Sequence, residues 1–116
     1  MKTSYIILFF CISFLSACKH TDVTPAYVKV YKHDGSVQCE ATAIDLNVMA
    51  KELINAGIDV ICSQKGDTGL MYVTVCGGAT GSINIYTIHK ENLTDAIALK
   101  FESVEQLTEY RDQKCE

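Results

Sequence analysis

The sequence predicts a small, disulfide-stapled α+β domain, and three observations lead to this class. Short runs of β-branched and aromatic residues alternate in hydrophobicity, as strands do. One segment repeats its apolar residues at helical spacing, and four cysteines are distributed over residues 39–115. The predicted order is β-α-β-β-β-α-α in a two-layer sandwich. We expect a mixed sheet with the helices mainly on one face.

The first strand and the first helix have the clearest local signals. Residues 27–32 ("YVKVYK") alternate with a β-branched face. Asp45 suits the N-cap of a helix, and Ile44 before it can pack on Met49 as a hydrophobic staple. Gly57 suits the residue after the last turn. Between them, apolar residues recur at helical spacing: Leu46, Met49, Ala50 and Leu53.

The remaining elements follow from turn and capping residues. Further strands are predicted over 58–62, 70–76 and 83–89, separated by turns at 64–69 ("QKGDTG") and 77–82 ("GGATGS"). Capping pairs predict two more helices, over 93–100 and 104–112. A β-α-β crossover places the first two strands in parallel, and the tight turns make the later neighbours antiparallel. This combination gives the expected mixed sheet.

The amino-terminal residues have the pattern of an export signal. Residues 5–15 form an apolar run after Lys2 that is too short for a bilayer, which takes about 20 apolar residues. The four residues that end this run, Leu15-Ser16-Ala17-Cys18, resemble the lipobox of bacterial lipoproteins. The resemblance implies cleavage before Cys18, a diacylglyceryl thioether on its sulfur and acylation of the new amino terminus. The chain then divides into a signal peptide (1–17), a lipid-anchored tether (18–25) and a single α+β domain (26–116).

The lipoprotein resemblance also implies a location. It places the protein at the bacterial cell envelope, anchored in a membrane and facing the periplasm or the exterior. Lys19 after the cysteine favours the outer membrane if the host is Gram-negative. In the competing interpretation Cys18 is a chance cysteine in an ordinary signal peptide. An ordinary cleavage site needs a small residue at −3, where this chain offers the bulky Leu15 or Phe14.

The charge of the mature chain bears on its partners. Without residues 1–17 the chain keeps 9 basic and 14 acidic residues, a net charge of −5. An acidic chain of this kind is a poor match for a polyanion. We therefore expect no nucleic-acid partner. We expect the membrane to be contacted through the lipid anchor.

Four cysteines remain after the signal and the lipidated residue are set aside: Cys39, Cys62, Cys76 and Cys115. An even number in an exported domain predicts two disulfides, with three possible pairings. In the predicted layout Cys39 and Cys62 lie at the same end of the sheet, and Cys76 at the other. We therefore predict Cys39–Cys62 and Cys76–Cys115. Metal binding is the alternative, but the nearest cysteines are 14 residues apart and form no close ligand pair, so we expect no metal or other cofactor.

No motif in the chain predicts catalysis. Asp67-Thr68-Gly69 matches the short signature of aspartic peptidases, which need two carboxylates that share a proton. Here the tripeptide falls where a turn is predicted, and turn chemistry accounts for it. No serine stands in a G-x-S-x-G elbow. We therefore predict a protein that is not an enzyme.

One predicted sheet face is rich in tyrosine and supplies the candidate binding residues. If the helices cover the face that carries Val28, Val30, Ile83 and Ile85, the opposite face is open. Tyrosine combines a large contact area with a polar tip and suits a protein- or glycan-binding surface. The alternative is that these tyrosines are ordinary strand formers, covered by the predicted helix over 104–112. The candidates on this face and in the adjacent turn are Tyr27, Tyr31, Tyr72, Tyr86, Lys65 and Asp67.

The sequence favours two functions over a third, an enzyme whose site no motif reveals. The first is a lipid-anchored, non-enzymatic binding module of the bacterial cell envelope. Its partner would be an envelope protein or a glycan. The second is an envelope inhibitor of a hydrolase, such as a lysozyme or a peptidase, that acts through the turns at 64–69 and 77–82.

Overall fold

The computed structural model describes residues 26–116, so the predicted signal peptide, lipobox and tether lie outside the described residues. The α+β prediction is confirmed: two helices accompany a five-stranded sheet. Neither helix within 26–116 is long and apolar enough to cross a membrane. The elements are β1 (Tyr27–His33), α1 (Leu46–Asn55), β2 (Cys62–Asp67), β3 (Ser82–His89), the 3-10 turn η1 (Lys90–Asn92), α2 (Leu93–Ala98), β4 (Glu102–Ser103), the 3-10 turn η2 (Val104–Gln106) and β5 (Arg111–Asp112).

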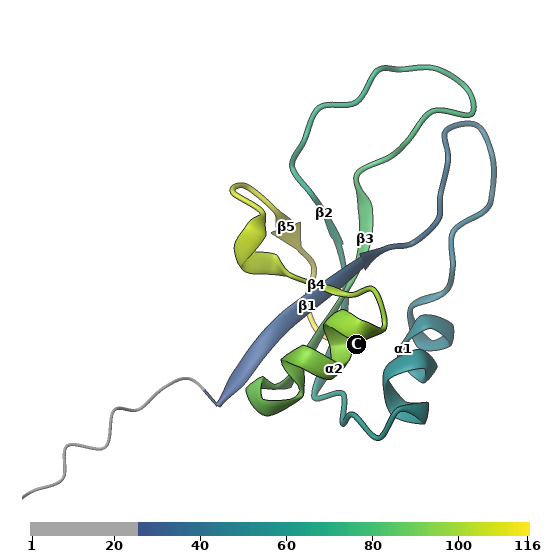
Figure 1. Cartoon of the computed structure of the whole chain (residues 1–116). Helices are drawn as coiled ribbons and strands as arrows, with labels where there is room; N and C mark the ends of the chain where they lie inside the picture. Colours follow the sequence, from purple (N-terminus) through teal and green to yellow (C-terminus); the bar gives the residue numbers. More distant parts are fainter. Residues whose placement is uncertain (1–25) are drawn as a thin grey trace, which may run out of the picture.

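The sheet is antiparallel throughout, so the predicted mixed sheet is wrong. Its strand order is β4-β1-β3-β2-β5. β1 and β2 do run in the same direction, because each pairs antiparallel with β3. However, β3 lies between them in the sheet. Figure 1 shows the three strands together at the centre of the domain. Helix α1 therefore connects two strands that run in the same direction, and β3 is inserted between these two strands.

The helices cover one face of the sheet and enclose the main core. α1 begins where predicted, and the Asp45 side chain accepts a hydrogen bond from the Asn47 N–H at 2.8 Å. The buried Tyr86 of β3 donates its hydroxyl hydrogen to the Leu46 carbonyl at 2.6 Å. This core joins both helices to the two central strands, and it is formed by Val30, Leu46, Met49, Ala50, Leu53, Ile58, Tyr86, Ile88, Ala96 and Phe101.

The opposite face is covered by the chain after β4, so the helix predicted over 104–112 is wrong. Ser103 caps only the short turn η2, where its side chain accepts a hydrogen bond from the Glu105 N–H. The chain then extends because its apolar side chains pack on the sheet and β5 pairs with β2. A second core results, formed by Tyr31, Ile83, Ile85 and Val104 with Leu107 and Tyr110 against them.

The second strand begins four residues later than the predicted strand over 58–62. Residues 62–67 pair with β3, so most of the turn predicted at 64–69 is strand. The sequence around Gly66 is typical of a turn, but Gly66 lies in β2, where close packing leaves no room for a side chain. A Cβ at this position would lie 2.6 Å from the Arg111 carbonyl oxygen and in collision with Ile85. The glycine therefore lets β5 approach β2 closely.

Two disulfides are present, as predicted, but the predicted pairing is wrong. The bonds join Cys39 to Cys76 and Cys62 to Cys115. Cys76 lies in a loop rather than a strand, and this loop folds beside the one that carries Cys39. The carboxyl-terminal segment runs back along β2, where the Glu116 N–H donates to the Ser63 carbonyl, and this brings Cys115 to Cys62.

Candidate functional site: the paired loops

Two long loops leave the same end of the sheet and stand side by side. We call residues 34–45 loop A, residues 68–81 loop B, and the two together the loop pair. Loop A follows β1 and loop B follows β2, at the end where His33 pairs with Ile83 and Asp67 with Ser82. Figure 1 shows the loops rising together above the sheet. The described chain begins at residue 26, next to the opposite end of β1.

Covalent and hydrogen bonds join the two loops into one unit. The Cys39–Cys76 disulfide links them with a Cα–Cα distance of 5.1 Å. The Gln38 N–H donates to the Gly78 carbonyl at 2.9 Å, and the Gly77 N–H donates back to the Gln38 carbonyl at the same distance. Below these contacts an isolated β-bridge joins Val37 to Ala79. Loops fixed this way lose little conformational entropy when they bind a partner.

The side chain of Gln38 holds the centre of loop B. Its amide nitrogen donates to the Val73 carbonyl at 2.7 Å and to the Ala79 carbonyl at 3.0 Å. Its oxygen accepts a hydrogen bond from the Val75 N–H at 2.9 Å. One side chain therefore satisfies backbone groups on both arms of loop B and fixes the spacing between them.

The base of loop B is also tightly held. The Tyr72 hydroxyl lies 3.1 Å from the hydroxyl of the buried Thr68. Gly69 has a φ of +74°, and a Cβ there would collide with the Glu109 carbonyl. The backbone turns at this point in a conformation that favours glycine, directly against the segment that covers the second core.

A buried polar network supports the start of both loops. Asp34 is 1% exposed, and its carboxylate accepts hydrogen bonds from the Ser36 N–H at 2.9 Å and the Ser82 hydroxyl. The Lys65 ammonium lies 3.1 Å from the same carboxylate and donates to Asn84 at 2.7 Å. Burial alone would raise the pKa of Asp34, but the hydrogen bonds from Ser36, Ser82 and Lys65 outweigh it and lower the pKa to about 2. The carboxylate is therefore charged throughout the physiological range.

The tip of loop B is apolar, exposed and uncharged. Loop B contains no charged residue. Its exposed fractions are 99% for Met71, 81% for Val73, 59% for Leu70 and 55% for Val75. Contiguous apolar side chains on a rigid protrusion are typical of a contact surface for another molecule. This surface is not predicted from the sequence, because "LMYVTVC" has the pattern of a buried strand. The glycines that flank it are the one local sign of a loop.

The six candidate binding residues do not form one surface. Tyr72 lies in the loop pair, whereas Tyr27 lies at the other end of β1, half-exposed beside His89. Tyr31 and Tyr86 are buried in cores on opposite faces of the sheet. The predicted open tyrosine face is therefore wrong, since Ile83 and Ile85 point away from the helices and Tyr86 points toward them. β3 is apolar on both faces, so its sequence does not distinguish them.

Lys65 and Asp67 have structural partners. Lys65 is part of the network around Asp34. Asp67 is exposed, and its carboxylate accepts a hydrogen bond from the Gly69 N–H at 2.7 Å, which fixes the first turn of loop B. Both residues fix the base of the loop pair, and neither belongs to its exposed tip.

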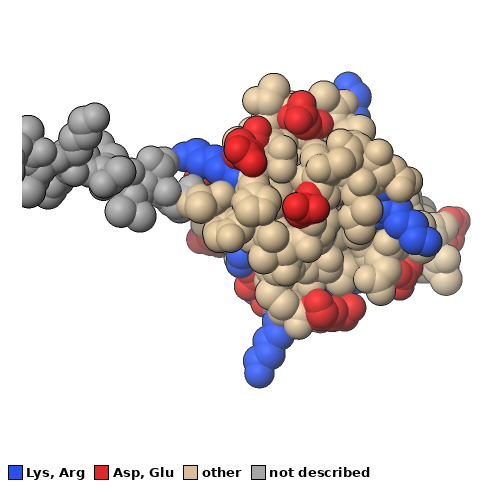
Figure 2. Space-filling view, turned by 90° about the horizontal axis from the view of Figure 1, so that it is seen from below, with Lys and Arg blue, Asp and Glu red and all other residues tan. Residues whose placement is uncertain are grey.

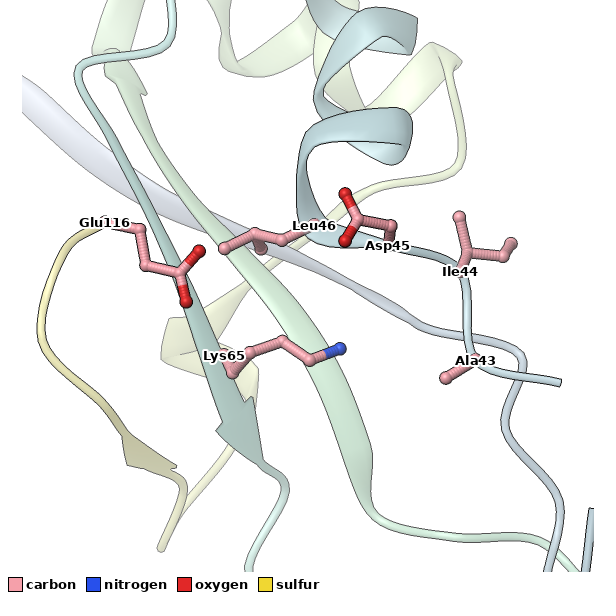
Figure 3. A pocket seen from close by; sticks show the side chains of 6 residues that line it. All are labelled: Ala43, Ile44, Asp45, Leu46, Lys65 and Glu116. Atoms are coloured by element: carbon pink, nitrogen blue, oxygen red, sulfur yellow. The ribbon is translucent and has the colours of Figure 1, made fainter. Parts of the chain in front are cut away.

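A shallow hollow of about 290 Å³ lies between the start of α1 and β2. Figure 3 shows Lys65 on β2, with Glu116 beside it and Asp45 at the helix start. A second hollow of about 290 Å³ lies along β2 and β5 and includes Asp67 and Arg111.

Residues 26–116 contain no group of three side chains placed to bind a metal ion. Comparison with protein-family models, curated proteins and solved structures finds no match to this chain.

Proposed function

We propose that the protein is a non-enzymatic binding module of the bacterial cell envelope, anchored through a lipid on Cys18, and that the loop pair is its contact surface. The observation that carries this proposal is the apolar tip of loop B on a crosslinked support. Exposed apolar side chains gain free energy when a partner buries them. Because the disulfide and Gln38 already fix the loops, little entropy opposes that gain.

The position of the loops fits a tethered protein. β1 has seven residues, and at about 3.3 Å per residue it separates the two ends of the sheet by roughly 20 Å. The tether from a lipidated Cys18 would join the domain at residue 26, at the end of β1 opposite the loops. The loop pair would then point away from the membrane. Figure 2 views the molecule from the side opposite the loops, and on this face acidic and basic side chains are scattered without a continuous basic patch. Such a face suits a position near a membrane without tight binding to anionic lipid.

A second candidate function is inhibition of an envelope hydrolase, such as a lysozyme or a peptidase. The observation that favours it is the shape of loop B, a rigid protrusion that could enter a cleft. Residues 64–67 cannot act as a turn, because they belong to β2. In this function the inhibitory segment would be residues 70–82.

Charge substitutions test the proposed contact surface. Met71→Asp with Val73→Asp places two carboxylates on the tip of loop B, where both side chains are exposed and contribute little to folding. Val48→Asp with Ile97→Asp is the matched control, because these apolar side chains are half-exposed on the two helices. We expect proteins that co-purify with the wild type from detergent-solubilised envelopes to be lost with the loop variant and kept with the control. Equal recovery with both variants contradicts the proposal.

The same preparation separates the two candidate functions. A recovered hydrolase whose activity falls when purified wild-type protein is added, and not when the loop variant is added, supports inhibition. A recovered structural or transport protein, or a glycan-linked complex, supports the binding module.

A further inference from the structure

We propose that residues 71–75 bind their partner by strand addition: the outer edge of this segment pairs with an exposed strand edge of another envelope protein. This rests on the proposed function, in which the loop pair is the contact surface. It adds the mode of binding and the kind of partner.

The segment has the sequence of a strand but no strand partner in the domain. Residues 70–75 read "LMYVTV", and aromatic and β-branched residues favour a pleated, half-buried surface. The sheet is complete without them, since β2 and β3 already pair up to Asp67 and Ser82, where loop B leaves. A strand-forming segment at an exposed tip, outside its own sheet, is therefore free to join another.

The inner edge of the segment is already paired, and the outer edge is free. In an extended chain the backbone groups of residues two apart point to the same side. Val73 and Val75 both turn backbone groups toward Gln38, which stands in for a neighbouring strand. From the side shared by Val73 and Val75 we infer that the groups of Tyr72 and Thr74 point to the opposite side. Within residues 26–116 the backbone N–H and C=O of these two residues make no hydrogen bond.

The side chains of residues 71–75 indicate what the partner must present next to the added strand. Tyr72 turns its hydroxyl toward Thr68, at the base of loop B. Alternation along an extended segment places Met71, Val73 and Val75 together on the other face. All three are more than half exposed, and loop B has no charge. The partner should therefore have apolar pockets at two-residue spacing next to its open strand edge.

The free backbone groups favour a protein over the other possible partners. Hydrocarbon offers no hydrogen-bond partner for a backbone N–H, so a membrane would leave Tyr72 and Thr74 unsatisfied. A second copy could pair with the outer edge, but it would present the same protruding loop and would leave the sides of both loops exposed. A concave protein surface can receive the loop and bury its sides as well.

A matched pair of substitutions at Thr74 tests the pairing. Thr74→Pro removes the outward N–H, and because this N–H has no partner within the domain the fold loses no hydrogen bond. Thr74→Ala removes the side chain and keeps the N–H. The partner is first identified in cells of the native host with the full-length, lipidated protein, by photocrosslinking from p-benzoylphenylalanine in place of Val73. The same probe in place of Val48 is the control.

The purified partner is then used for affinity and exchange measurements. We expect Thr74→Pro to weaken binding about tenfold relative to Thr74→Ala, as the loss of one buried hydrogen bond does. In the wild-type protein the Tyr72 and Thr74 amides should exchange hydrogen much more slowly when the partner is bound. This second measurement uses no variant and does not depend on the folding of Thr74→Pro.

The outcomes separate this inference from the function on which it rests. Equal affinities of the two Thr74 variants, together with unprotected amides, overturn strand addition and leave the contact surface in place. A crosslink from position 73 to lipid or to a second copy overturns the proposed partner. Crosslinks to protein from position 48 and none from position 73 contradict the proposed function itself.

Discussion

Cys39 and Cys76 lie 37 residues apart in the sequence, and their disulfide joins the two loops that form the exposed end of the domain. The sheet and both cores lie below this bond and are formed by other residues. The Cys39–Cys76 bond therefore shapes the candidate contact surface, whereas Cys62–Cys115 fixes the carboxyl-terminal segment against β2.

The two disulfides should differ in function more than in stability. In the chain-entropy model each bond stabilises the fold by about 3–4 kcal/mol, because the closed loops have similar lengths. Urea unfolding should therefore show comparable losses for Cys39→Ser with Cys76→Ser and for Cys62→Ser with Cys115→Ser. Only the first pair should weaken binding of the envelope partner. Peptide mapping without reduction should recover Cys39 joined to Cys76, and a peptide joining Cys39 to Cys62 contradicts the described fold.

Asp34 should make the stability of the domain depend on acid pH. Its folded pKa of about 2 lies below its usual value near 3.8, so the stabilisation is complete above about pH 4 and is lost as the pH falls toward 2. The contribution is about 2 kcal/mol. Asp34→Asn should lower the free energy of unfolding at pH 7 and flatten this part of the pH profile. The exposed Asp67→Asn is the control and should lower the free energy of unfolding at pH 7 by less than Asp34→Asn.

The loss of stability on replacing a tyrosine should depend on how deeply that tyrosine is buried. Tyr86→Ala removes a fully buried ring and its hydrogen bond to Leu46, and should cost about 3–5 kcal/mol of stability. Tyr72→Ala should cost less than about 1 kcal/mol, because the half-buried ring belongs to the loop rather than to a core. Thermal unfolding of both variants checks the difference. A similar melting temperature for the two contradicts the described packing.

The lipobox resemblance makes a prediction about processing. Cys18→Ser should abolish incorporation of labelled fatty acid and leave the precursor uncut by lipoprotein signal peptidase. Mass spectrometry of the wild-type mature protein should find a lipid-modified amino-terminal cysteine at position 18. An unmodified amino terminus on the mature chain is incompatible with the lipid anchor.

The parts of the fold that the sequence predicts depend on local signals. α1 is predicted correctly because Asp45, Ile44 and Gly57 mark its ends within a few residues of the chain. β1 also follows from its own alternation. The helix over 104–112 is not formed, because packing on Tyr31 and pairing with β2 outweigh a local capping signal at Ser103.

The candidate site was harder to predict, because it depends on contacts between distant segments. Residues 70–76 have the local preferences of a strand, and their sequence cannot show that β3 pairs elsewhere. Gly66 has the local preferences of a turn, and its sequence cannot show that Arg111 packs against it. The predicted disulfide pairing is wrong for the same reason, since it depends on where the predicted strands end.

We propose that the tip of loop B contacts an envelope partner, and the affinity of the purified partner for variants of this tip tests the proposal. The purified partner is titrated with wild-type protein, with Val73→Asp and with Ile97→Asp, each checked for an unchanged melting temperature. We predict that Val73→Asp weakens binding by at least about tenfold, because a carboxylate would be buried in an apolar pocket. Ile97→Asp should bind like the wild type. Equal affinity for all three proteins contradicts the claim.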